Sequence, residues 1–329
     1  MNSFARSRRL LGQFILIAVV LACLPLRAQD KAAEKEWKQN YEEAEDAFKR
    51  SQFIAAGQFY EQAAAAAESF PAKDPRLAEA LRKQAAARLQ TREYAKAETA
   101  VRRALALDEK RLGTNDWHLT DDLLFFGQAC MYLRKGDEAD KYFARAQDLL
   151  EWKFGRWDRT VAICLQHRGD AAMVGERYDD AEKYLKDALR LAESPRLRQT
   201  GPAYSTPRLQ AARQEQIAAV LNDLGLLYRT TKRYDKSEQA FRRVIDLLET
   251  KFGKDSLYLC TPLSNYADTL LVEHKYAEAE TELTRCLAIL KFAQSDHPLM
   301  TSVLKRLSKL KDLESGTAPT APDQRDPAK

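Results

Sequence analysis

The chain has 329 residues, of which 31% are charged and 45% are hydrophobic, and its formal net charge is +5. This balance excludes a wholly disordered chain, which has too few apolar residues for a core, and a polytopic membrane protein, which carries fewer charges. The 12 glycines are few for an all-β fold or a glycine-rich nucleotide site. Four of the basic residues are arginines within the first 28 residues, so bulk charge gives little support for nucleic-acid binding.

Residues 1–28 show the three parts of a secretory signal peptide. Arginines precede an apolar run, Phe14–Leu24, and the small residue Ala28 offers a cleavage site. As a helix this run spans about 16 Å, roughly half of a hydrocarbon core. We therefore expect an exported protein, periplasmic or secreted. The alternative is a lipoprotein, because Val20–Cys23 resembles a bacterial lipobox in which Cys23 is acylated, and only this anchor would bring membrane contact.

A short pattern typified by Tyr94–Glu98 repeats along the body of the chain. Its copies recur 42 residues apart, apart from one shorter first interval and one 14-residue insertion, and they begin at Phe53, Tyr94, Gly136, Tyr178, Tyr234 and Tyr276. These first residues are called anchors below.

Small and apolar residues hold fixed places around each anchor. Nine residues before it stand Ala44, Ala85, Gly127, Gly169, Gly225 and Ala267, and three residues after it stands Ala or Ser. Larger apolar residues follow seven after it. Spacings of three, four and seven place side chains on one face of a helix. Each unit is therefore predicted to be a helical hairpin whose apolar edge is buried by the next unit.

Two segments give the repeat a family resemblance. Leu224-Gly225-x-x-Tyr228 and the following Ser237-x-x-x-Phe241 resemble the tetratricopeptide-repeat signature. The 42-residue period is longer than the usual period of about 34, and is similar to the repeats of kinesin light chains. The resemblance implies an all-α, right-handed solenoid of about six hairpins that binds a protein or peptide in its concave groove.

The pattern divides the chain into six regions. We expect a signal peptide at 1–28, four units over 30–193, a proline-containing loop insertion over 194–213, two units over 214–292, a capping helix over 296–313 and a disordered tail over 314–329. The insertion could also act as a hinge between the four-unit block and the two-unit block.

Motifs for catalysis are missing from the sequence. The four histidines are not spaced as metal ligands, and the chain contains no phosphate-binding loop, no nucleophile elbow and no Cys-x-x-Cys. We expect no enzyme activity, no cofactor and no metal. The favoured interpretation is a non-catalytic exported scaffold, and the alternative is a structural or assembly subunit of an envelope complex, lipid-anchored through Cys23.

Family positions carried over to this chain give candidate groove residues on the first helix of each hairpin. They are Tyr41, Phe48, Arg82, Leu124, Gln128, Met131, Tyr132, Gln166, Asp170, Met173, Asn222, Arg229 and Asp268. The alternative is that longer helices rotate some of these side chains into packing between hairpins. The ligand class stays open, because the two-carboxylate clamp known in the family needs Lys and Asn where this chain has Tyr41 and Glu45.

Cysteine spacing suggests one candidate disulfide. In an antiparallel hairpin the positions nine before and three after an anchor face each other, and seven steps outward along both helices this register pairs Cys260 with Cys286. Cys130 and Cys164 are out of register and are expected to be free. The alternative is that all four are small buried apolar residues.

Overall fold

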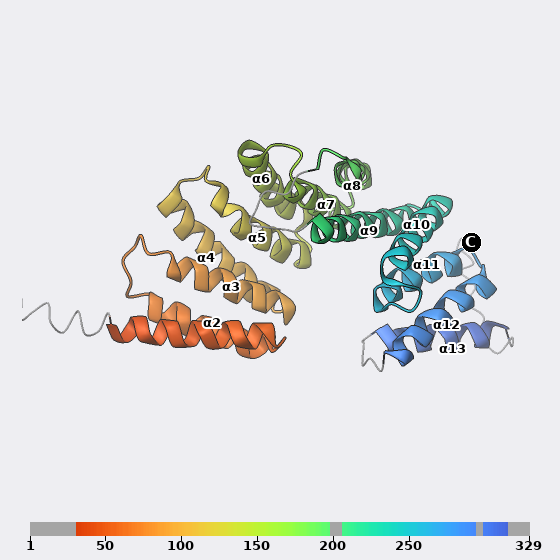
Figure 1. Ribbon diagram of the computed structural model, residues 1–329, viewed down its shortest axis with the longest axis horizontal. Helices are drawn as coiled ribbons and strands as arrows, with labels where there is room; N and C mark the ends of the chain where they lie inside the picture. Colours follow the sequence, from red (N-terminus) through yellow and green to blue (C-terminus); the bar gives the residue numbers. More distant parts are fainter. Residues whose placement is uncertain (1–30, 198–205, 294–298, 315–329) are drawn as a thin grey trace, which may run out of the picture. The chain divides into compact units, whose positions relative to one another are not determined.

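The computed structural model describes residues 31–197, 206–293 and 299–314, and the elements within these ranges are helices (Figure 1). Residues 31–49 are helical. The helices that follow are α2 (Phe53–Ala67), α3 (Arg76–Gln90), α4 (Tyr94–Leu112), α5 (Thr120–Tyr132), α6 (Gly136–Phe154), α7 (Arg159–Val174), α8 (Tyr178–Glu193), α9 (Thr206–Thr230), α10 (Tyr234–Phe252), α11 (Cys260–Val272), α12 (Tyr276–Phe292) and α13 (Leu299–Glu314). Two short 3₁₀ helices, η1 (Trp117–Leu119) and η2 (Leu257–Leu259), precede α5 and α11. The all-α prediction is confirmed.

Neighbouring helices pair into hairpins, and their contacts divide the chain into two compact units, Met1–Lys153 and Phe154–Lys329. The first unit contains the helix at 31–49 with α2, α3 with α4, and α5 with α6. The second contains α7 with α8, α9 with α10, and α11 with α12, followed by α13, which packs on α11 and α12. Val303 and Leu310 of α13 are buried there, as expected of a capping helix.

The boundary between the two compact units falls at the end of α6, one hairpin earlier than the insertion. The helices on either side of the insertion stay in contact, because α9 packs directly on both α7 and α8. The insertion is also shorter than expected, because α9 begins at Thr206. Pro207 is compatible with that first helical turn, where no backbone N–H is needed.

The repeating small residues mark where the two helices of a hairpin cross. The large residues seven after each anchor, from Tyr60 to Leu283, are buried completely, and so are the small residues three after it. An added Cβ would lie 2.5 Å from the Phe143 ring at Gly127, and 2.7 Å from the Phe241 ring at Gly225. Glycine therefore stands where its partner is bulkiest in these two hairpins, and alanine stands opposite Val101 and Leu283.

The turn inside each hairpin has three residues, and its middle residue is left-handed. These residues are Ser51, Arg92, Arg134, Glu176, Lys232 and His274, with φ between 58° and 64°. After α9, the Lys232 N–H donates to the Arg229 carbonyl at 3.0 Å and the Arg233 N–H donates to the Tyr228 carbonyl at 2.7 Å. This is the usual C-terminal cap of a helix, made here with residues other than glycine.

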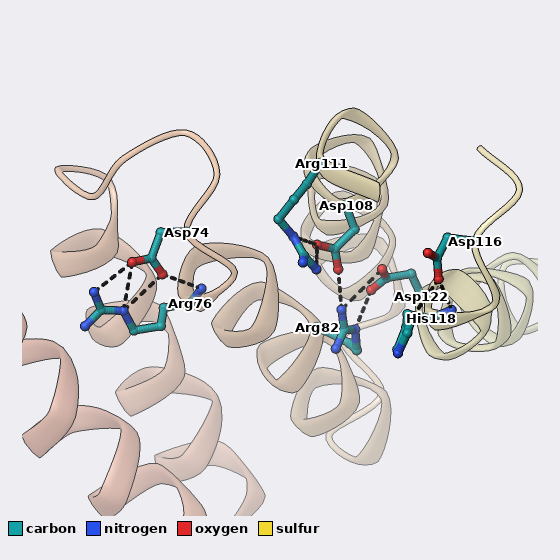
Figure 2. Close-up of polar contacts among 8 residues, drawn as sticks. All are labelled: Asp74, Arg76, Arg82, Asp108, Arg111, Asp116, His118 and Asp122. Atoms are coloured by element: carbon teal, nitrogen blue, oxygen red, sulfur yellow. Dashed lines mark hydrogen bonds and ion pairs between the residues drawn. The ribbon is translucent and has the colours of Figure 1, made fainter. Parts of the chain in front are cut away.

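The loop between one hairpin and the next has its own two caps. The second helices α4 and α10 end at Gly113 and Gly253, with φ of 87° and 86°. Before the next first helix, a carboxylate or hydroxyl accepts the backbone N–H two residues later. Figure 2 shows this at Asp74, which binds the Arg76 N–H at 3.0 Å, and at Asp116, which binds the His118 N–H at 2.9 Å. Asp158 and Ser256 hold the same place.

Three pairs of successive hairpins are joined by an ion pair that repeats in the same register, here called the turn latch. The glutamate four residues after an anchor binds the basic residue just before the next anchor. The pairs are Glu98 with Lys135, Glu182 with Arg233, and Glu238 with Lys275. Glu98 and Glu238 are 8% and 4% exposed, so each needs its cation.

Within the described residues, no helix combines the length and the hydrophobicity that a membrane span requires. The predicted signal peptide at 1–28 and residues 315–329 of the predicted tail lie outside the described residues.

Candidate binding surface

The candidate groove residues all lie on the first helices of the hairpins, and none of them is fully buried. In the first unit they lie on the helix at 31–49, on α3 and on α5, and in the second unit on α7, α9 and α11. Tyr132 is 51% exposed, and the other twelve are half-buried. These side chains therefore stand at the edge between one hairpin and the next, where they can meet both solvent and the neighbouring helix.

In the first unit, Arg82 is tied into a buried charge network (Figure 2). Its Nε donates to Asp122 Oδ1 at 2.6 Å and its Nη2 to Asp108 Oδ2 at 2.5 Å. Arg111 donates to the other oxygen of Asp108 at 2.7 Å. The two carboxylates are 0% and 1% exposed. Arg82 thus joins α3 to α4 and α5, and its guanidinium is committed to this network.

The electrostatics of this network centre on Asp122. The pKa of Asp122 is raised to about 6, chiefly by burial and to a smaller extent by the nearby Asp108 carboxylate, while Arg82 opposes the shift. Asp122 therefore takes up a proton at a higher pH than a solvated aspartate does.

The apolar part of the surface in the first unit lies mainly on α5. Leu124, Gln128, Met131 and Tyr132 follow one another at spacings of one, three or four, which places them along one side of the helix. Tyr132 stacks on Tyr94 of α4, with ring centroids 4.7 Å apart. This stripe combines three apolar side chains with one amide.

At the N-terminal end of the same unit the candidate residues are aromatic and engaged. Tyr41 donates to Glu79 of α3 at 2.7 Å and stacks on Trp37 at 4.9 Å. Phe48 packs edge-on against Phe53 at 5.1 Å. These side chains hold the first hairpin together and link it to the second.

In the second unit the candidate residues form polar links between neighbouring first helices. Gln166 of α7 binds Gln216 at 2.6 Å and Asp223 at 2.5 Å, both on α9. Burial, followed by the charge of Asp170, raises the pKa of Asp223 to about 8.

The same kind of link continues toward the end of that unit. Asn222 of α9 accepts a hydrogen bond from Asn265 of α11 at 2.9 Å. Asp268 of α11 is 3.3 Å from Arg229 and 3.0 Å from Arg306 of α13. Of the candidates in this unit, Met173 brings an apolar side chain, and it is half-buried.

The sequence pattern did not predict the residues that form hydrogen bonds with these candidates. Glu79, Asp122, Asn265 and Arg306 are each 38–43 residues from the candidate that they bind. Each partner carries a polar group that complements the candidate and lies about one repeat period from it. Such pairs can be found in the sequence by aligning successive first helices with each other.

One group of potential metal ligands comes together in the first unit, formed by Glu98, Cys130 and Glu138. Both carboxylate oxygens of Glu98 accept hydrogen bonds from Lys135 at 2.9 Å. Burial raises the pKa of the Cys130 thiol to about 12, which disfavours the thiolate that a metal needs. The position of Glu98 in this group is therefore explained by its ion pair with Lys135 in the turn latch, and not by a bound metal ion.

The cysteine register is as expected, but the bond is absent. Cys260 and Cys286 lie opposite each other in the hairpin of α11 and α12, and both are free, buried thiols in the structure. Cys130 and Cys164 are also buried.

Comparison with known proteins supports the fold. Residues 216–292 match the family model described as tetratricopeptide repeat. No curated protein matches the chain.

The solved structures similar to this chain include the following three. BtubC (BKLC) from P. vanneervenii is 18% identical with a TM-score of 0.54, covering 81% of this chain and 94% of that one. A putative kinesin light chain of Podosopora anserina with TPR-like repeats is 13% identical with a TM-score of 0.50, covering 67% and 97%. A Rap protein complexed with Competence and Sporulation Factor is 17% identical with a TM-score of 0.53, covering 86% and 76%. At these identities the likeness shows the fold.

Proposed function

We propose that the chain is an exported, non-catalytic scaffold of the tetratricopeptide-repeat type, which binds a protein or peptide on the first-helix face of its hairpins; the match of residues 216–292 to that family model supports this. Repeats of this kind support protein–protein interaction, and the similar Rap protein was solved in complex with Competence and Sporulation Factor. A fold of stacked hairpins builds an extended surface for a partner rather than an enclosed pocket.

The observation that carries this proposal is the stripe on α5. Most charged candidates are satisfied by neighbouring helices, as Arg82 is by Asp108 and Asp122. On α5, Tyr132 instead keeps 51% of its surface exposed, and Met131 beside it is half-buried. Exposed apolar side chains beside an amide suit a segment that anchors through its own apolar side chains, and methionine adapts readily to such contacts.

The test is capture of partners by the full exported chain carrying Met131→Glu, with Met173→Glu as the corresponding change in the second unit. Each substitution introduces a charge on the proposed face, so we expect partner capture to fall at least tenfold. Ile54→Glu is the matched control, because Ile54 is 66% exposed on the second helix α2. Undiminished capture by both Met variants, or equal loss with Ile54→Glu, would count against the first-helix face.

The non-catalytic part of the proposal rests on how the carboxylates are held. Asp108 and Asp122 form the most buried carboxylate pair near the surface, and both are bound by arginines. A general acid or base needs an open approach for substrate. Turnover of esterase or peptidase substrates by pure protein, lost in a carboxylate variant, would overturn this part.

Export and anchoring are tested together at the N-terminus of the protein recovered from cells. Cleavage after Ala28 gives a chain that begins at Gln29, and this is the expected result. A chain that begins at Cys23 and takes up a labelled fatty acid would instead favour the envelope-anchored subunit. An uncleaved chain in the cytoplasm would contradict both.

A further inference from the structure

The two cysteines of the last hairpin meet across the helix pair. Cys260 is the first residue of α11, and Cys286 lies in the second half of α12. The Cys260 Sγ is 3.9 Å from the Cys286 carbonyl oxygen, and the Cys286 Sγ is 3.5 Å from the Cys260 carbonyl oxygen. This reciprocal contact means that each side chain projects toward the other residue's backbone, as a bond between the two sulfurs requires.

The two thiols are chemically unequal. A hydrogen bond from Cys286 lowers the pKa of the Cys260 thiol, and the same contact together with burial raises the pKa of Cys286. Cys260 also stands at the N-terminus of a 13-residue helix, where the helix dipole favours a thiolate. Because the thiolate is the nucleophile in thiol–disulfide exchange, Cys260 is suited to attack and Cys286 to resolve. Both thiols are buried, so an oxidant reaches Cys260 when the last hairpin opens locally.

Cys130 and Cys164 lie outside the last hairpin. Cys130 is on α5 in the first compact unit, and Cys164 is on α7, two hairpins before the last one. They serve as internal controls for any treatment that oxidises thiols at random.

We propose that Cys260 and Cys286 are a redox pair that closes a disulfide across the last hairpin, with a disulfide-bearing oxidant as the co-reactant. The Cys260 thiolate attacks one sulfur of the oxidant, whose second sulfur leaves as a thiol and takes up a proton. Cys286 then loses its proton and attacks the Cys260 sulfur, which releases the other half of the oxidant as a second thiol. Two protein thiols are oxidised and one oxidant disulfide is reduced.

The bond would fasten the end of the repeat array. Terminal hairpins open more easily than central ones, because they have a neighbour on one side only. Among the described residues the last hairpin is α11 with α12, and its outer side is covered by the single helix α13 instead of a further hairpin. Closing the loop between the two cysteines restricts the opened chain, so we expect oxidation to raise the melting temperature by roughly 5–10 °C.

The experiment treats the full folded chain with oxidised glutathione, blocks the remaining thiols with iodoacetamide in denaturant, and digests the protein with trypsin without reduction. Cleavage after Lys254, Lys275, Arg285 and Lys291 places the two cysteines on separate peptides, 255–275 and 286–291. We expect these peptides to be linked, while the peptides with Cys130 and Cys164 stay alkylated. Alkylation of all four cysteines by iodoacetamide would overturn the proposal.

Single variants test the order of attack. Cys286→Ala is expected to accumulate one glutathione adduct on Cys260, because the resolving thiol is missing. Cys260→Ala is expected to acquire no adduct on Cys286. Equal adducts on both variants would refute the assigned roles, and so would adducts on Cys164 at the same rate. The wild-type linkage decides the proposal even if one of these variants folds poorly, and neither measurement depends on the binding partner.

Discussion

The pairing of Gly225 with Phe241 makes a residue-level prediction about packing. Both residues are buried where α9 and α10 cross, and a methyl group at position 225 would press against the ring. We expect Gly225→Ala to reduce the free energy of unfolding by about 1–3 kcal/mol, the usual cost of overpacking. Urea denaturation followed by circular dichroism measures it.

The last hairpin supplies the matched control, because it combines Ala267 with Leu283 at the same two positions. Adding Phe241→Leu to Gly225→Ala copies that combination. The double variant is therefore expected to lose less stability than the sum of the two single variants, with a coupling of at least about 1 kcal/mol. Strict additivity would show that the glycine and the ring are not matched to each other.

Asp122 makes a residue-level prediction about pH. Burial raises its pKa from 3.8 to about 6, so between these values the folded protein holds a proton that the unfolded chain has released. This group therefore adds stability as the pH falls from about 7 to about 4. Relative to Asp122→Asn, we expect the wild-type free energy of unfolding to rise by about 1–3 kcal/mol over that range.

Urea denaturation of both proteins at the two ends of the range gives this difference. The comparison with the Asn variant cancels the titration of the many surface carboxylates, which both proteins share. A difference that is constant with pH, or that falls on acidification, would mean that Arg82 holds Asp122 ionised throughout.

At the scale of the element, the turn after each first helix contains one residue that is strained by its positive φ. Lys232 is exposed and has a φ of 58°, a conformation that costs an L-residue about 1 kcal/mol and costs glycine little. We expect Lys232→Gly to raise the free energy of unfolding by about 0.5–1 kcal/mol. Gln239→Gly, on the exposed side of α10, should lower it by a similar amount, and thermal melts of the two variants test the contrast.

The helices themselves were predictable because their signals are local and repeated. Ala, Gly and large apolar residues at fixed distances from each anchor gave the hairpins, their turns and the crossing points. The start of α9 was missed because prolines near position 207 suggested a loop, although the first turn of a helix tolerates proline. The polar partners of Arg82 and Asn222 were missed because they depend on how successive hairpins align, which a pattern read within one hairpin does not contain.

At the scale of the whole molecule, the division into two units predicts how a disturbance spreads. Stability in repeat proteins comes from each repeat and its immediate neighbours. Gly225→Ala should therefore speed amide hydrogen exchange in α9, α10 and the adjoining α8 and α11, and leave exchange in α2, α3 and α4 unchanged. Gly127→Ala should instead speed exchange in α5 and α6 of the first unit. Mass spectrometry of exchange in both variants checks this, and a uniform increase across the chain would contradict it.

The boundary between the two compact units could not be predicted from the sequence for a related reason. The insertion before α9 has the composition of a linker, yet α8 and α9 pack against each other on either side of it. Composition describes the segment itself, whereas a boundary between units depends on which helices stay in contact around it.

The turn latch bears on how such arrays change in length. Because Lys135, Arg233 and Lys275 occupy one shared place and their glutamates another, any of these glutamates would meet a cation if the hairpins that carry them were joined in another order. A gene duplication or deletion among these hairpins therefore creates no unpaired acidic group at the new junction, whereas Gly57 and Glu93 set the first two hairpins outside this rule. The protein can therefore gain or lose whole hairpins of this kind while an ion pair still joins the hairpins at the new junction.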